Sequence, residues 1–189
     1  MKEVFLMKKW IACILVIALS LSLCGCLAKM TAVESFLLAM KKMDLVAMRA
    51  ELVPDEKMGS LYTKLQETDL DEETLNVLIR FYSLAQYTVG EASSVGVGEQ
   101  KVAVTLKVPD VERILSLVKA QTLVSGDSAA SILEDMLEDG SISKSMMKDY
   151  SLSVKMTETD GAWKIPYGDK ENADFVKALS LTEMLDFIN

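Results

Sequence analysis

Residues 101–108 read KVAVTLKV and alternate strictly between large apolar side chains and polar or small ones. The larger apolar residues fall on one face: Val102, Val104, Leu106 and Val108. A period of two predicts a β-strand with one buried face. A preceding strand near residues 87–94 would join it through Gly96-Val97-Gly98, so this part of the sequence predicts an antiparallel hairpin.

A second hairpin is predicted around Asp160-Gly161, a dipeptide that favours a two-residue turn. With that turn Thr159 opposes Ala162, and these apolar side chains then share one face: Leu152, Val154, Met156, Trp163 and Ile165. We therefore expect Trp163 to be a buried anchor of the core.

Helix signals occupy most of the remaining chain. These N-capping residues each precede an amphipathic run: Thr31, Asp44, Asp71 and Asp110. Further helical segments are predicted around residues 57–66, before Gly140 and over about 171–179, whereas the structure of residues 180–189 is left open. The order of elements indicates an α+β fold, with N-terminal helices packed on one face of a curved antiparallel sheet of about four strands and a helical insertion between the two hairpins.

Length and composition restrict the chemistry that the chain can perform. It has 189 residues, half of them apolar, which suits one core of ordinary size but is short for two domains. It contains no histidine, and all its cysteines lie in the first 26 residues: Cys13, Cys24 and Cys26. Past that point the residues needed for a Ser-His-Asp triad, a cysteine nucleophile, a His/Cys zinc site, haem or an iron-sulfur cluster are missing.

The first 26 residues have the pattern of an export signal. Lys2, Lys8 and Lys9 precede an apolar run over residues 10–23, as in a secretory signal peptide that begins at Met1 or Met7. The run ends in Leu23-Cys24-Gly25-Cys26, which resembles the lipobox of bacterial lipoproteins. That resemblance implies a diacylglyceryl group on the Cys26 sulfur and cleavage between Gly25 and Cys26. The alternative is an uncleaved membrane-spanning helix, because residues 10–28 carry no charge.

The predicted organisation is a signal peptide at residues 1–25, a lipidated tether at 26–30 and a single domain at 31–189. After cleavage, 17 basic and 27 acidic side chains remain, a net charge of −10. Nucleic acid is therefore a poor partner, and the lipid rather than surface charge must hold the protein to the membrane. Residues 27–30 reach about 14 Å when extended, so we expect the domain to lie close to the outer surface of the cell membrane.

Two segments resemble one family of bacterial proteins. Residues 32–44 (AVESFLLAMKKMD) are similar to the first helix of small lipoproteins with a nuclear-transport-factor-2-like, cone-shaped α+β domain. Residues 160–165 (DGAWKI) resemble the Asp-Gly-x-Trp-Lys-Ile hairpin of the same group. The resemblance implies a cone-shaped fold, which often holds a pocket between sheet and helices. The helical insertion and the tail after Ile165 depart from the compact pattern of that family.

Several residue patterns suggest chemistry, but each has a simpler structural interpretation. An EF-hand loop starting at Asp69 would need Gly at position 74 and Glu at position 80, where the chain has Thr74 and Arg80. Met40 and Met43 could bind copper(I), although core packing is the commoner role of such methionines. We expect no metal, no cofactor and no catalytic residue. The aromatic residues that could line a pocket are Tyr82, Tyr87, Tyr150 and Trp163, and a filled core is the alternative.

Two classes of function are consistent with these observations. The first is a non-catalytic envelope lipoprotein that binds a small apolar ligand, a peptide or another envelope protein. The second is a cone-fold enzyme of the isomerase or dehydratase kind, which would use a buried carboxylate of raised pKa together with a tyrosine hydroxyl. The first is preferred, because almost every acidic residue falls at a helix cap or on a charged face.

Overall fold

The structure is a computed structural model that describes residues 31–188. Along the chain its elements are α2 (Ala32–Lys41), α3 (Leu45–Ala50), α4 (Leu61–Glu67), α5 (Glu72–Ser83), β1 (Gln86–Gly96), β2 (Glu99–Pro109), α6 (Val111–Ser125), α7 (Ala129–Glu138), α8 (Ser141–Ser145), β3 (Met147–Thr159), β4 (Ala162–Lys164), the 3-10 turn η1 (Lys170–Asn172), α9 (Ala173–Leu179) and α10 (Leu181–Ile188). The residues from Thr31 onward form one compact unit.

The strands form one antiparallel sheet in the order β1-β2-β3-β4, with both predicted hairpins present. In the centre Val104 of β2 pairs with Val89 on one side and Leu152 on the other. The β3–β4 turn pairs Thr159 with Ala162, as the sequence predicts. Both turn residues have positive φ, 53° at Asp160 and 76° at Gly161, which is the geometry of a type I′ turn.

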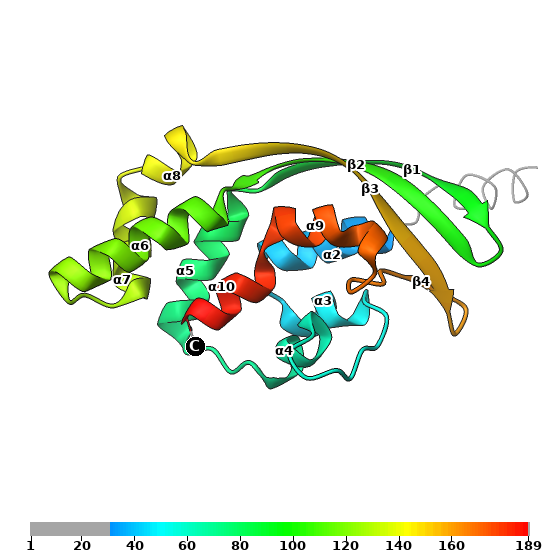
Figure 1. Cartoon of the computed structure of the whole chain (residues 1–189), viewed down its shortest axis with the longest axis horizontal. Helices are drawn as coiled ribbons and strands as arrows, with labels where there is room; N and C mark the ends of the chain where they lie inside the picture. The colour runs from blue at the N-terminus through cyan, green and yellow to red at the C-terminus, as the bar shows by residue number, and fades with distance from the viewer. Residues whose placement is uncertain (1–30, 189) are drawn as a thin grey trace, which may run out of the picture. The chain divides into compact units, whose positions relative to one another are not determined.

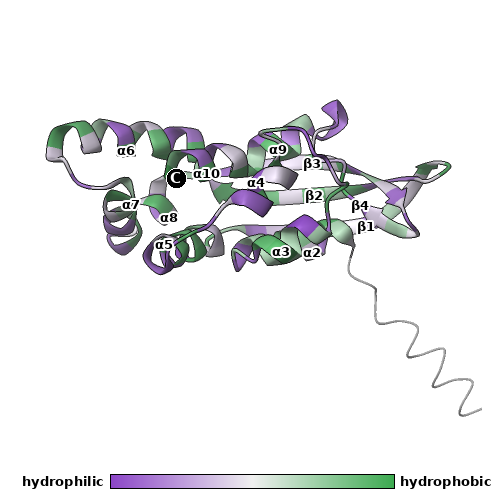
Figure 2. Ribbon diagram, turned by 90° about the horizontal axis from the view of Figure 1, so that it is seen from below, coloured by the Kyte–Doolittle hydropathy of each residue, from purple (hydrophilic) through white to green (hydrophobic). Residues whose placement is uncertain are grey.

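Helices cover one face of the curved sheet, so the α+β class predicted from the sequence is confirmed (Figure 1). The four predicted capping side chains accept hydrogen bonds from backbone N–H groups three residues on, for example Thr31 from Glu34 at 3.1 Å and Asp71 from Thr74 at 2.7 Å. Such bonds satisfy N–H groups that have no partner within the helix. In Figure 2, α6 and α7 extend past the end of the sheet opposite the two hairpin turns.

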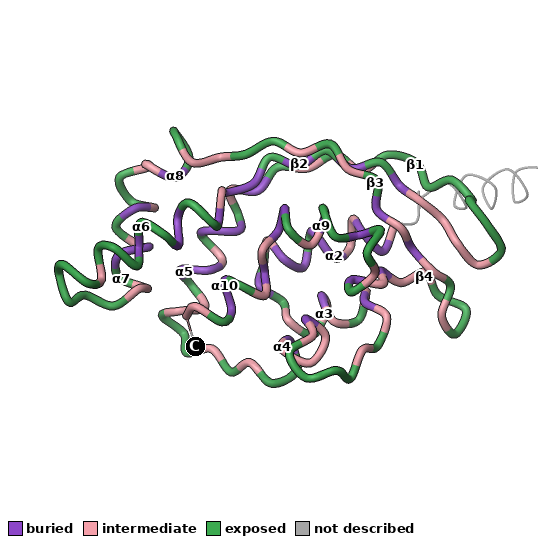
Figure 3. The backbone as a smooth tube through the Cα atoms, in the orientation of Figure 1, coloured by how far each residue is buried: buried purple, intermediate pink, exposed green. Residues whose placement is uncertain are grey.

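The core lies between the helices and the inner face of β2 and β3. The buried sheet residues include Val102, Val104, Leu106, Val108, Val154 and Met156, and those from helices include Phe36, Leu37, Phe81, Phe175 and Leu185. Burial of apolar area of this kind is the main force that holds the layers together. Figure 3 shows that the buried parts of the chain turn inward, toward the space enclosed by sheet and helices.

A side-chain amide fastens the C-terminal helices to the sheet. Asn172 is fully buried, and its Oδ1 accepts a hydrogen bond from the Lys155 N–H at 2.8 Å. Its Nδ2 donates to the carbonyls of Lys155 and Pro166, each at 3.1 Å. These bonds occupy the edge of β3 at the point where β4 has ended, so the amide takes the place of a neighbouring strand.

Several local predictions need correction. The helix predicted around residues 57–66 begins only at Leu61, because Ser60 is the N-cap of α4 and its hydroxyl accepts the Thr63 N–H. Trp163 is only partly buried, because it lies on β4, a three-residue strand at the edge of the sheet. Residues 181–188, left open by the sequence, form α10.

None of the helices in residues 31–188 is long and apolar enough to cross a membrane.

Candidate functional site

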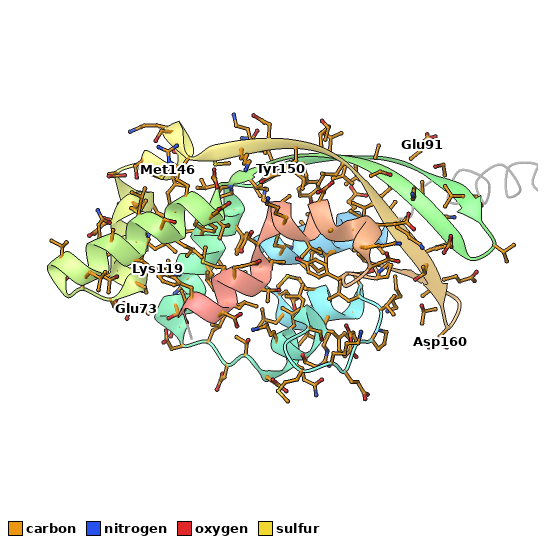
Figure 4. The ribbon with its side chains drawn as sticks, viewed as in Figure 1. Glu73, Glu91, Lys119, Met146, Tyr150 and Asp160 are labelled. Atoms are coloured by element: carbon orange, nitrogen blue, oxygen red, sulfur yellow. The ribbon has the colours of Figure 1, made fainter. Side chains whose placement is uncertain are left out.

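A groove of about 640 Å³ lies between α6, the start of β3 and the α9–α10 pair. Its apolar lining comes from Val111, Leu115, Tyr150, Ala178 and Phe187, and its polar lining from Asp110, Glu112, Ser116, Lys119, Lys177, Ser180, Glu183 and Asp186. Figure 4 labels two of these residues, Tyr150 on β3 and Lys119 on α6. This volume is within the usual range of small-molecule and peptide sites.

The walls of the groove are set by two local features. At one end the Asp110 N–H donates to the Met146 carbonyl at 2.8 Å, which fixes the start of α6 beside the start of β3. At the other, Ser180 has a φ of 43° and separates α9 from α10. Positive φ is strained for a serine, so the bend between these helices depends on the packing around it.

Charges of both signs surround the apolar floor. Asp110, Glu112, Glu183 and Asp186 are acidic, and Lys119 and Lys177 are basic. The Lys119 ammonium lies 5.4 Å from the centre of the Phe187 ring, within the range of a cation–π contact across the groove. Asp186 forms an ion pair with Lys64 of α4. The groove can therefore pair with positive and negative groups of a ligand at its rim and can contact apolar groups at its floor.

The four aromatic residues suggested by the sequence do not meet in one pocket. Tyr150 lines the groove, whereas Tyr87 lies beneath the Lys41 ammonium, 5.9 Å from its ring centre. Tyr82 is a core residue whose hydroxyl donates to the Leu179 carbonyl at 3.4 Å. Trp163 lies on the short β4 strand, in contact with the core. The four aromatic residues therefore do not share one site, although Tyr87 and Tyr150 both line a second pocket of about 480 Å³ that spans β1, β2 and β3.

Tyr167 is a buried tyrosine that sequence analysis missed. Its ring packs against Phe36 and Phe175, with ring centres 6.0 and 6.3 Å away, and its hydroxyl has no hydrogen-bond partner among the described residues. Burial raises the pKa of the Tyr167 hydroxyl, and the negative charge of Glu183 raises it further. Burial also raises the pKa of Tyr82 well above its ordinary value, with smaller contributions from Tyr167 and Glu183.

Every Asp and Glu in residues 31–188 is at least partly exposed, and Asn172 is the buried polar residue of that range. Burial raises the pKa of the Glu51 carboxyl, but the ammonium of Lys164 opposes this shift. No group of three His, Cys, Asp or Glu side chains within the described chain could hold a metal ion. Met40 and Met43 both lie in the core.

The predicted lipidation and cleavage residues, Cys26 and Gly25, lie outside the described residues, as do the whole signal peptide and the alternative spanning helix at residues 10–28. Their interpretation therefore rests on the sequence.

Comparisons with known proteins give one distant likeness. No family model matches the chain, and no curated protein matches it. Among solved structures, the chain is similar to the candidate lipoprotein YcdA of Bacillus subtilis, with 19% identity and a TM-score of 0.35. The match covers 76% of this chain and 44% of that one. A likeness this low is not evidence of a shared fold, so the resemblance to nuclear-transport-factor-2-like lipoproteins stays a prediction and we argue function from this chain's own residues.

Proposed function

We propose that the protein is an exported lipoprotein of the cell envelope, anchored to the membrane through a lipid on Cys26, and that its domain is a non-catalytic binding module. The observation that carries this proposal is the predicted signal peptide at residues 1–25 together with Cys26. A basic start, an apolar run over residues 10–23 and the sequence Leu23-Cys24-Gly25-Cys26 follow one another in the order that lipoprotein export needs. Two acyl chains on one cysteine anchor a protein stably, whereas a single chain does so only marginally.

The distribution of polar groups supports a non-catalytic role. An isomerase or dehydratase of the cone-fold kind needs a carboxylate whose pKa is raised in an apolar pocket, close to a tyrosine hydroxyl. Here the Tyr82 hydroxyl donates to a main-chain carbonyl, the Tyr167 hydroxyl has no partner among the described residues, and each described carboxylate reaches solvent. We therefore favour binding over catalysis.

The groove between α6 and α9–α10 is the surface that we assign to binding. Its apolar floor, at Leu115 and Phe187 for example, suits an apolar side chain or short acyl group. Its rim offers both carboxylates and ammonium groups, as at Glu112 and Lys177. This combination fits a short amphipathic peptide or a small zwitterionic ligand better than a purely apolar molecule.

The anchoring proposal is tested by a matched pair of substitutions in the producing cell. Cys26→Ala removes the residue that would be modified, so we expect the full-length precursor to accumulate, held in the membrane by its apolar run. Cys24→Ala leaves the predicted site intact and should be processed like the wild type. Intact masses of the two membrane-extracted proteins give the answer. Normal processing of the Cys26→Ala variant would contradict the lipoprotein assignment.

The binding proposal is tested by filling the groove. Ser116 is exposed on α6 and lines the groove, so Ser116→Trp should fill it without disturbing the core. Ser131→Trp places the same ring on the exposed surface of α7 and is the control. Native mass spectrometry should detect a copurifying ligand on the wild type and the control but not on the groove variant. Equal ligand on all three proteins would place binding elsewhere.

A further inference from the structure

The end of the β1–β2 hairpin is uncharged and apolar. Residues 92–98 read ASSVGVG, in a chain of which a quarter of the residues are charged. Val95 is 51% exposed and Val97 is completely exposed. Figure 3 shows the β1 side of this hairpin end as exposed chain, whereas the returning chain is intermediate in burial over residues 98–101. Two exposed valines at the tip of a projecting hairpin form a small apolar surface that water does not favour.

The chain enters the domain at the same end as this hairpin. Lys41, in the last turn of α2, has its ammonium 5.9 Å from the ring centre of Tyr87, near the start of β1. Helix α2 therefore ends beside the start of β1, and the start of α2 lies toward the end of the sheet that carries the two hairpin turns (Figure 1). Residues 27–30, which connect Cys26 to the domain, attach to that end.

The reach of the tether and the projection of the hairpin are of similar size. From Tyr87 to Gly96, β1 is about 30 Å long at 3.3 Å per residue, although its bulges and curvature shorten it. The ten residues of α2 span about 15 Å beside it. The tip therefore projects roughly 15 Å beyond the start of α2, whereas residues 27–30 extend at most about 14 Å. A membrane within reach of the tether is also within reach of the tip.

The neighbouring hairpin limits how deep this end can enter. The Glu158 N–H donates to the Gly98 carbonyl at 2.9 Å, so the two hairpin turns lie together. The β3–β4 turn carries Glu158 and Asp160, both exposed, whereas the β1–β2 turn carries no charge between residues 92 and 98. Carboxylates are costly to bury in hydrocarbon, so the contact must be shallow and confined to the valines.

We propose that residues 95–97 rest on the surface of the membrane that holds the Cys26 lipid, so that the hairpin and the lipid orient the domain together. This inference deepens the proposed function, because it depends on the lipid anchor. The proposed orientation directs α6, α7 and the end of the sheet opposite the hairpin turns away from the bilayer, toward the outside of the cell (Figure 2).

The test uses the full lipidated protein in phosphatidylcholine vesicles. The mature chain has no free thiol once Cys26 is modified, so Val97→Cys gives a single site for an environment-sensitive fluorophore. Leu123→Cys is the matched control, because Leu123 is 87% exposed at the opposite end of the domain. Lipids carrying a nitroxide on the acyl chain should quench the label at position 97, with a blue-shifted emission, and leave the label at position 123 unchanged.

A second pair of variants separates specific contact from general proximity. Val95→Glu in the labelled protein should abolish the quenching at position 97, since a carboxylate replaces an apolar contact. Val46→Glu makes the same change at an exposed residue of α3 and should leave the quenching intact.

The outcomes distinguish this inference from the anchor on which it depends. If the intact mass of the sample shows the lipid and the label at position 97 is not quenched, the hairpin contact is overturned while the lipoprotein assignment stands. Quenching at position 123 alone would show that the opposite end faces the bilayer. A mass without lipid overturns the proposed function and this inference together.

Discussion

Replacement of Asn172 tests how the C-terminal wall of the groove is held to the sheet. Asn172→Ala removes three hydrogen bonds, to the N–H and carbonyl of Lys155 and to the carbonyl of Pro166. Each such bond contributes about 1 kcal/mol net, and a buried group left unpaired costs about 1 to 3 kcal/mol. We expect the free energy of unfolding to fall by about 3 kcal/mol, a large part of the stability of an ordinary domain.

The measurement is urea unfolding of the chain from Leu27 onward, prepared without lipid and followed by Trp163 fluorescence. We expect the wild type to unfold cooperatively, because the domain has its own core. For a domain of this size, 1 kcal/mol corresponds to roughly 2 to 4 °C in Tm, so the Asn172→Ala variant should melt about 6 to 12 °C lower.

Two further variants separate hydrogen bonding from side-chain volume. Asn172→Asp has the same shape and keeps the acceptor for the Lys155 N–H, but loses both donors and adds a charge in a buried position, so it should destabilise at least as much as alanine. Asn76→Ala, at an exposed position of α5, should change stability by less than about 0.5 kcal/mol. An Asn172→Ala variant as stable as the Asn76→Ala variant would refute the reasoning.

Three other outcomes follow from the structure. Trp163→Ala should lower the free energy of unfolding by about 1 to 2 kcal/mol, because the ring is only partly covered; a fully buried aromatic residue would give about 3 to 5 kcal/mol. Urea unfolding followed by circular dichroism measures this loss. Tyr167→Phe removes an unpaired buried hydroxyl and should raise the stability by up to about 1 kcal/mol; a loss of more than that would show that the hydroxyl has a partner. A backbone hydrogen bond lowers the pKa of Asp169, and a hydrogen bond from Lys101 lowers the pKa of Glu171. Because the folded-state pKa values lie below the unfolded ones, the stability from this pair is present above about pH 4.5 and is lost as the pH falls through the folded-state values. The Asp169→Asn/Glu171→Gln double variant should therefore lose less stability on acidification than the wild type. An equal loss in the two proteins would show that folding does not lower the pKa values of this pair.

The features that sequence analysis predicted correctly are those decided by neighbouring residues. The Asp160-Gly161 turn depends on two residues that tolerate positive φ, and both adopt it. The cap at Asp71 depends on one carboxylate and a backbone N–H three residues on. The alternation over residues 101–108 gives the buried face of β2 directly, because side chains of a strand point to opposite sides.

The groove could not be predicted from the sequence, because its walls come from segments far apart in the chain. Leu115 of α6 and Phe187 of α10 meet only when both helices pack beside β3, and no local pattern encodes that distance. Tyr150 was singled out only as an aromatic residue, and nothing in its neighbourhood distinguished it from Tyr87, which does not line this groove but shares a second pocket with Tyr150.

Two further errors have tertiary causes. Trp163 has the apolar periodicity of a core residue, yet its burial is limited by the length of β4, which ends at Lys164. Tyr167 follows Pro166 in a segment without periodicity, and it is buried because α2 and α9 bring Phe36 and Phe175 against it.

The central claim is that this chain is exported and anchored by a lipid on Cys26, and one measurement tests it most directly. The protein is extracted from the membranes of the cell that produces it, digested, and its N-terminal peptide identified by mass spectrometry. The account predicts a peptide that begins at Cys26 and carries a diacylglyceryl group on the sulfur. A peptide that begins at Met1 or Met7, with Cys26 unmodified, would contradict it.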